Sequence, residues 1–188
     1  NATGSVDVTV SGGTAGYTYS WTGTDYLGNA FSAATADLSG LPAGDYDLGV
    51  TDANGCNATL ATVTITQPDE LSVALDDQTN VLCYGGTTGA IEVTVSGGAA
   101  PYTYSWTGTN YLGGLTFSPS EDPTGLRAGT YNLSVRDANG CTVTLPPVTI
   151  IQPDELTISS DGTTNVTCFD GSTGAINVTV DGGALPYD

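Results

Sequence analysis

The feature that most constrains the fold of this chain is a repeat with a period of 85 residues. This step separates matching tryptophan, cysteine and proline residues: Trp21 and Trp106, Cys56 and Cys141, Cys83 and Cys168, Pro68 and Pro153. A fixed period of this length with β patterning is typical of a tandem array of sandwich domains. We therefore expect three repeats, of which 1–68 lacks its first strand, 69–153 is complete, and 154–188 holds only the first strands.

The patterning inside one repeat indicates an all-β fold. In the segment 89–106, apolar and polar residues alternate on both sides of Gly97-Gly98, as expected for two half-buried strands. The segment recurs at 4–21 and begins again at 174–187. We predict tandem immunoglobulin-like or PKD-like β-sandwich domains, one per repeat. The aromatic residues expected in the core are Trp21, Trp106, Tyr102, Tyr104 and Tyr131.

Several strand details of the middle repeat follow from its local sequence. The first strand is predicted at 71–75, with an extension at 80–83 after a break at Asp76-Asp77. Asn139-Gly140 between two β runs predicts a hairpin. In the last strand the apolar positions change parity, which predicts a β-bulge, and Pro146-Pro147 marks this strand as an edge strand.

The charge of the chain limits its partners. Asp and Glu outnumber Lys and Arg by 20 to 2, which gives a net charge of −18. Nucleic acid and anionic membrane surfaces are therefore poor partners, because binding to them depends on basic side chains. We interpret the acids as residues that keep a β-rich chain soluble. No apolar run approaches ~18 residues, so membrane insertion is not expected.

A set of short motifs recurs with the repeat. In the middle repeat these motifs are Cys83-Tyr-Gly-Gly, Gly89-Ala-Ile, Gly97-Gly98, Pro101-Tyr-Thr-Tyr-Ser-Trp106, Gly129-Thr-Tyr131, Asp137-Ala-Asn-Gly-Cys141 and Ile150-Ile-Gln-Pro153. Together they resemble the SprB repeat, which builds the very large surface adhesin of gliding Bacteroidota. The departures are small: Gly16 stands where the middle repeat has Pro101, and Arg127 stands where the first repeat has Pro42.

The resemblance implies a filament-forming adhesin that acts in gliding motility. Such a protein is exported by the type IX secretion pathway, lies outside the cell at the outer membrane, and works with the gliding machinery. The family has no catalytic or ligand residues that carry over to this chain. The expected partners are neighbouring repeats of the same chain, with surface polysaccharide or the substratum as external contacts.

The residues themselves favour a structural, non-enzymatic role. The junctions 67–70 and 152–155 are short and each contains one proline, so we expect a semi-rigid rod. The alternative function is a carbohydrate-binding module of an exported multidomain protein. For an exposed contact, the best candidates are Tyr26-Leu27 and Tyr111-Leu112, although the favoured role of these residues is to cover the open side of the small core. Adjacent Asp69 and Glu70 point apart on an extended chain, so no carboxylate pair is placed for glycoside hydrolysis.

Cys56, Cys83, Cys141 and Cys168 either form disulfides or remain thiols. Three alternatives are open: buried thiols, a bridge within a repeat, and a bridge between a Cys83-type residue and the hairpin cysteine of the following repeat. A bridge between Cys83 and Cys141 is awkward, because we expect these residues at opposite ends of the domain and a disulfide needs Cα atoms within ~7 Å.

No cofactor is expected, and calcium is an alternative. The candidate calcium ligands are the junction acids Asp69, Glu70, Asp154 and Glu155, with Asp137 or Asp52 at the hairpins, since calcium takes carboxylate and carbonyl oxygens. An aspartate before Asn-Gly is more simply a turn former. No EF-hand loop is present. Zinc is not expected, because the chain has no histidine and no closely spaced cysteine pair.

Overall fold

The structure of the chain is a computed structural model that describes residues 2–187, and all regular secondary structure in this range is β-strand. The predicted all-β fold is therefore confirmed. The chain forms two compact units, Asn1–Pro68 and Asp69–Asp188, which we describe separately. Within the described residues, no helix is present that is long and apolar enough to cross a membrane.

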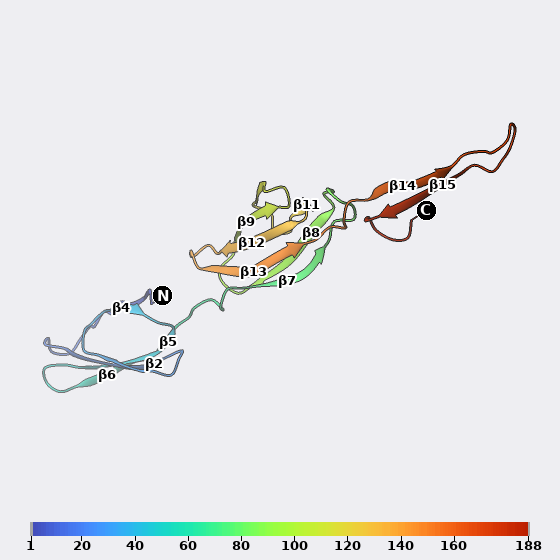
Figure 1. The fold of residues 1–188 in the computed structure, drawn as a ribbon. Coiled ribbons are helices and arrows are strands. Elements are labelled where there is room, and N and C mark those ends of the chain that lie inside the picture. Colours follow the sequence, from blue (N-terminus) through green and yellow to red (C-terminus); the bar gives the residue numbers. More distant parts are fainter. Residues whose placement is uncertain (1, 188) are drawn as a thin grey trace. The chain divides into compact units, whose positions relative to one another are not determined.

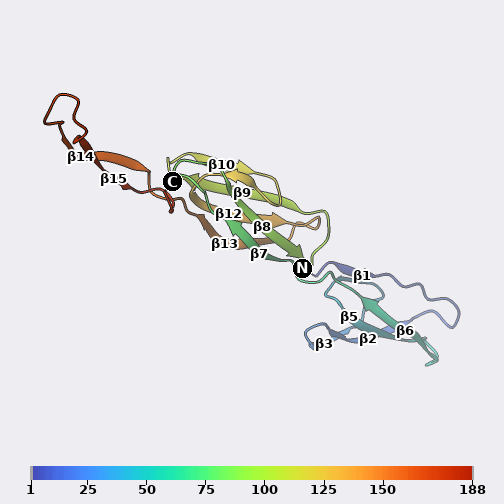
Figure 2. The same cartoon turned by 90° about the vertical axis from the view of Figure 1, so that its right-hand side faces the viewer.

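The middle repeat (residues 69–153) is a sandwich of two antiparallel sheets (Figures 1 and 2). Its strands are β7 (Ser72–Thr79), β8 (Gly89–Ser96), β9 (Thr103–Asn110), β10 (Leu115–Ser118), β11 (Thr124–Leu126), β12 (Gly129–Arg136) and β13 (Thr142–Ile150). One sheet has the order β11-β8-β7 and the other has the order β10-β9-β12-β13. Seven strands in two such sheets make an immunoglobulin-like sandwich, as predicted.

The core of the middle repeat lies between its two sheets. Trp106 on β9 is 2% exposed, and Tyr131 on β12 is 1% exposed. The hydroxyl of Tyr131 donates a hydrogen bond to the backbone oxygen of Arg127 (2.8 Å), four residues upstream. A buried tryptophan on the third strand and a tyrosine corner near the start of the sixth strand are hallmarks of immunoglobulin-like domains. All buried residues of this cluster lie between Val81 and Ile150, so the core comes entirely from this repeat.

The first strand differs from the sequence-based expectation. β7 continues through Asp76-Asp77, because one extra residue forms a β-bulge opposite β8. The prediction of a break there, followed by a strand at 80–83, was wrong. The polypeptide instead crosses toward the end of β13, where the Val81 amide donates to the Ile151 oxygen (2.9 Å) and the Ile151 amide donates to the Asn80 side chain (3.0 Å).

The last strand has the predicted bulge. Between Tyr131 and Leu133, the register of β12 against β13 shifts by one residue, which accommodates Pro146-Pro147. β13 is also the outer strand of its sheet, as the two prolines indicated. The first unit has the same irregularity, between Tyr46 and Leu48 of the strand that pairs with its last strand.

The first unit repeats the larger sheet of this sandwich. Its strands are β1 (Gly4–Val6), β2 (Thr18–Asp25), β3 (Ala30–Ala33), β4 (Leu38–Leu41), β5 (Gly44–Thr51) and β6 (Asn57–Ile65). The sheet order is β3-β2-β5-β6, with β1-β4 as a second, two-stranded sheet. Trp21 and Tyr46 are buried, and the Tyr46 hydroxyl donates to the Pro42 oxygen (2.9 Å). Residues 7–10 match the part of β8 that pairs with β7 in the middle repeat. Among the described residues of the first unit no strand takes the place of β7, so β1 ends at Val6.

The last part of the chain is a two-stranded hairpin of β14 (Thr157–Thr164) and β15 (Ala175–Asp181), drawn as a long ribbon in Figure 1. Its bulge between Ser160 and Gly162 matches the bulge of β7. Asp161 accepts a hydrogen bond from the Thr179 hydroxyl (2.6 Å), just as Asp76 accepts one from Thr94 (2.6 Å). The first hairpin of the repeat therefore folds the same way in both copies.

Candidate functional site

The entry end of the middle repeat holds its first residues and the Gly97-Gly98 loop. The Gly98 amide donates to the backbone oxygen of Asp69 (2.8 Å), and the Tyr102 hydroxyl donates to the Gly97 oxygen (2.6 Å). Gly97 has φ +70°, and a Cβ atom there would overlap the Glu70 carbonyl oxygen. The glycine pair therefore lets the incoming chain pass directly over the loop.

A buried carboxylate joins this loop to the Asn-Gly hairpin. Asp137 is the single buried polar or charged residue among those that the structure describes, with 6% exposed. Its two oxygens accept hydrogen bonds from the amides of Ala99 (3.0 Å) and Cys141 (2.7 Å). In the first unit, Asp52 makes the same contacts with Thr14 (2.9 Å) and Cys56 (2.8 Å). From the sequence, this aspartate is a turn former and a secondary calcium candidate. Its bond to the Gly97-Gly98 loop was missed, because Ala99 lies 38 residues away in the chain.

The hydrogen bonds shift the ionisation of both aspartates. Burial raises the pKa of Asp137, but four backbone amides, beginning with Ala99 and Cys141, together lower it below the ordinary value of 3.8. The pKa of Asp52 is also lowered, mainly by the amides of Thr14 and Cys56. A lowered pKa means that each ionised carboxylate stabilises its domain above about pH 4, and that this stabilisation is lost on acidification.

We expect Asp137→Asn to destabilise the middle repeat at neutral pH and to weaken its acid sensitivity. An amide offers one acceptor oxygen where the carboxylate offers two, so one backbone N–H loses its partner. The Tm should fall by on the order of 5–10 °C at pH 7, and the difference from wild type should shrink between pH 5 and pH 3. Thermal unfolding monitored by Trp106 fluorescence in a Trp21→Phe background measures both effects. Asp52→Asn is the matched control and should leave the middle repeat unchanged.

The four acids proposed as calcium ligands are all exposed. The backbone oxygens of Asp69 and Asp154 instead accept hydrogen bonds from Gly98 (2.8 Å) and Gly183 (2.9 Å). Within residues 2–187, no group of three or more acidic, cysteine or histidine side chains is arranged to hold a metal ion. Asp69 and Asp154 thus contribute their backbone oxygens to the fold. Within the same residues, the carboxylates of the four acids do not come together as a calcium site.

The exit end of the middle repeat holds the Cys83 loop. The Gly85 amide donates to the side-chain oxygen of Gln152 (3.0 Å), and the Arg127 guanidinium donates to the Gly85 oxygen. All four cysteines of the chain are free and exposed, so the expectation of buried thiols does not hold in this structure. The physical reason is that each cysteine lies in or beside a turn, beyond the strands that enclose the core.

An exposed aromatic pair lies beside the Cys83 loop. The rings of Tyr84 and Tyr111 are 5.8 Å apart and tilted by 59°. Tyr84 is 47% exposed, and the neighbouring Leu112 is 68% exposed. Tyr111-Leu112 and Tyr26-Leu27 are all exposed, which fits a surface contact better than the favoured role of covering the core. Sequence reasoning missed Tyr84, because its ring partner is 27 positions away.

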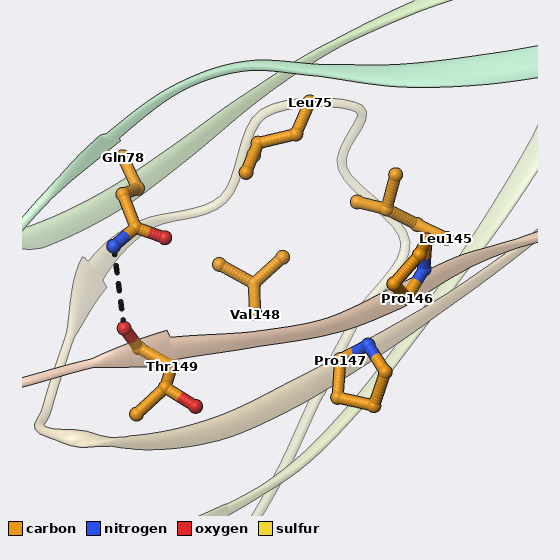
Figure 3. Close-up of a pocket in the computed structure, with 7 residues that line it drawn as sticks. All are labelled: Leu75, Gln78, Leu145, Pro146, Pro147, Val148 and Thr149. Atoms are coloured by element: carbon orange, nitrogen blue, oxygen red, sulfur yellow. Dashed lines mark hydrogen bonds between the residues drawn. The ribbon is translucent and has the colours of Figure 1, made fainter.

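A shallow groove runs between the edge strands β7 and β13. Its lining residues are Leu75, Gln78, Leu145, Pro146, Pro147, Val148 and Thr149. Figure 3 shows Leu75 across from Val148, with the Gln78–Thr149 hydrogen bond (3.4 Å) at one side. The groove is mostly apolar and carries no ionisable group, so it offers packing surface and no acid–base chemistry.

The aromatic residues expected in the core take two kinds of position. Trp21, Trp106 and Tyr131 are buried, whereas Tyr102 and Tyr104 are half-buried and pack against the core. Burial, followed by contact with the Glu121 carboxylate, raises the pKa of Tyr104 to about 12. These side chains therefore support the sandwich and do not form an open ligand platform.

Comparison with known proteins gives a family. The model of the SprB repeat matches residues 1–25, 75–110 and 160–188. The chain carries SprB repeats. The matched segments of these SprB repeats include the Gly-Gly loop of each copy, and the first two also include the core tryptophan. No curated protein sequence matches the chain.

The solved structures that match this chain include a tetra-tandem repeat in the extending region of a large adhesion protein. It is 20% identical, with a TM-score of 0.34, and the alignment covers 88% of this chain and 48% of that chain. This chain thus spans about half the length of that protein. The amphioxus IgVJ-C2 molecule is 15% identical, with a TM-score of 0.37, and the alignment covers 80% of this chain and 96% of that one.

Proposed function

We propose that this chain is a stalk segment of a long exported adhesin, which acts as a semi-rigid, non-enzymatic rod on the surface of a gliding bacterium. The observation that carries the proposal is the recurrence of one SprB repeat in three segments at a constant period. In the family that these motifs resemble, such repeats build a filament in gliding motility that leaves by type IX secretion. The neighbouring repeats of the same chain are then its first partners.

The junction between repeats supports the rod. The Gln152 side chain is hydrogen-bonded to Gly85 of the middle repeat, and the Asp154 oxygen is hydrogen-bonded to Gly183 of the third. Pro153 is the single residue between these two anchored positions, and its ring fixes φ near −65°. A linker of one restrained residue leaves little freedom for hinging.

Small-angle X-ray scattering on the chain tests this rod. We expect a radius of gyration well above the about 16 Å of a single compact globule of this length. Inserting Gly-Ser-Gly-Ser between Pro153 and Asp154 should broaden the distance distribution, while the same insertion after Gly113, in an exposed turn, should not. Because the exposed carboxylates of the four junction acids belong to no metal-holding group within residues 2–187, the profile should be the same in calcium and in chelator. A compact wild-type particle would refute the rod.

A further inference from the structure

The four cysteines fall into two classes by their place in the repeat. Cys56 and Cys141 each follow an Asp-Ala-Asn-Gly turn, and we call them the entry thiols. Cys83 and Cys168 each lie in the loop after the first strand, and we call them the exit thiols. All four are exposed and free.

Each class is held in the same way in both of its copies. The amides of the entry residues Cys141 and Cys56 donate to Asp137 (2.7 Å) and Asp52 (2.8 Å). The oxygens of the exit residues Cys83 and Cys168 accept hydrogen bonds from glycine amides three positions later, at 2.9 and 3.0 Å. The backbone around each thiol is therefore held by the same hydrogen bonds in every copy of the repeat that contains it.

The two classes lie at opposite ends of the middle repeat. Cys141 directly precedes β13, which is nine residues long. Cys83 lies two residues after Val81, whose amide bonds to Ile151 just beyond the other end of that strand (2.9 Å). Nine residues of strand span about 26 Å, whereas disulfide-bonded Cα atoms lie within about 7 Å. A bridge within one repeat is thus excluded in the folded domain.

Each class also lies beside a junction. The exit loop is bonded to Gln152, directly before Pro153, where the chain leaves the repeat. The entry hairpin is bonded through Asp137 to the amide of Ala99, and the amide of the adjacent Gly98 bonds to Asp69, where the chain enters. Because the repeat recurs, an exit thiol and the entry thiol of the next repeat flank the same short linker.

We propose that the exit thiol of each repeat forms a disulfide with the entry thiol of the repeat that follows it. Cys83 then pairs with the hairpin cysteine of the third repeat, which the period places after residue 188. Both thiols lose a proton, the S–S bond forms, and two electrons pass to a disulfide oxidant, which leaves as two thiols. Oxidising compartments outside the cytosol supply such oxidants. Each pair of neighbouring repeats is then joined twice, by the proline linker and by a covalent staple.

A tandem duplicate of residues 69–153 tests the proposal. Its internal junction, Gln152-Pro153-Asp69-Glu70, has the same residue types as the natural Gln152-Pro153-Asp154-Glu155. Each copy contains its own two sheets and its complete core, so each copy folds by itself. After oxidation with glutathione disulfide, non-reducing peptide mass mapping should find one protein disulfide, between Cys83 of the first copy and Cys141 of the second.

Two matched variants complete the test. Cys83→Ser in the first copy should abolish the protein disulfide, whereas Cys83→Ser in the second copy should leave it intact. Both variants replace an exposed side chain, and circular dichroism will verify that they fold. The proposal is overturned by a bridge within one copy, by a bridge between the two Cys83 residues, or by four thiols that stay open to alkylation or glutathionylation after oxidation.

Discussion

A Trp106→Ala chain is expected to lose most of the stability of its middle repeat. The indole is 2% exposed in the core, and its N–H donates to the Glu121 oxygen (3.2 Å). Truncating a buried tryptophan costs about 3–5 kcal/mol, a large fraction of the about 5–15 kcal/mol that stabilises a whole domain. The Tm of the middle repeat should fall by more than about 12 °C. Thermal unfolding by circular dichroism measures this loss.

The first unit provides the internal control for this variant. Trp21 occupies the matching position in a separate core, and the chain has no other tryptophan. Its fluorescence should therefore report an unchanged transition of the first unit in the Trp106→Ala chain. Equal destabilisation of both units would contradict the assignment of one independent core to each repeat.

Gly97→Ala is expected to have the second-largest effect, more than about 3 kcal/mol on the middle repeat. Two costs combine at this position. The residue has φ +70°, where an L side chain is strained by about 1–2 kcal/mol. In addition, its Cβ would overlap the Glu70 carbonyl oxygen, and this contact with backbone cannot relax by a side-chain rotation.

Gly125→Ala separates these two costs. Gly125 has the same φ of +70°, but a Cβ atom there meets nothing within 4 Å. It should cost only the conformational strain, about 1–2 kcal/mol. Chemical denaturation of both variants gives the comparison, and equal losses would show that the close approach of the junction chain to Gly97 contributes nothing. The third repeat has the same arrangement, with Gly182 against Glu155.

Much of the fold is predictable from local patterns in the sequence. The alternation in 89–106 corresponds to β8 and β9, and Asn139-Gly140 forms the turn between β12 and β13. The parity change before Val148 corresponds to the β13 bulge. These features depend on neighbouring residues, so a local reading suffices. At Asp76-Asp77 the local pattern predicted a strand break that does not occur. Two adjacent acids resemble a turn, but a β-bulge keeps β7 continuous through them.

By itself, the sequence determined the repeat, its all-β character, its aromatic core and its family motifs. The expected placement of Cys83 and Cys141 at opposite ends is confirmed by the contacts of Val81 and Asn80 with Ile151. Only the tertiary structure decided that Gly97-Gly98 connects two different sheets, that Asp137 joins two distant loops, and that Asn80 bonds to Ile151. The reason is physical: periodicity and turn chemistry act between near neighbours, whereas these relations depend on contacts between residues 38 to 71 positions apart. Such contacts exist only once the two sheets have packed.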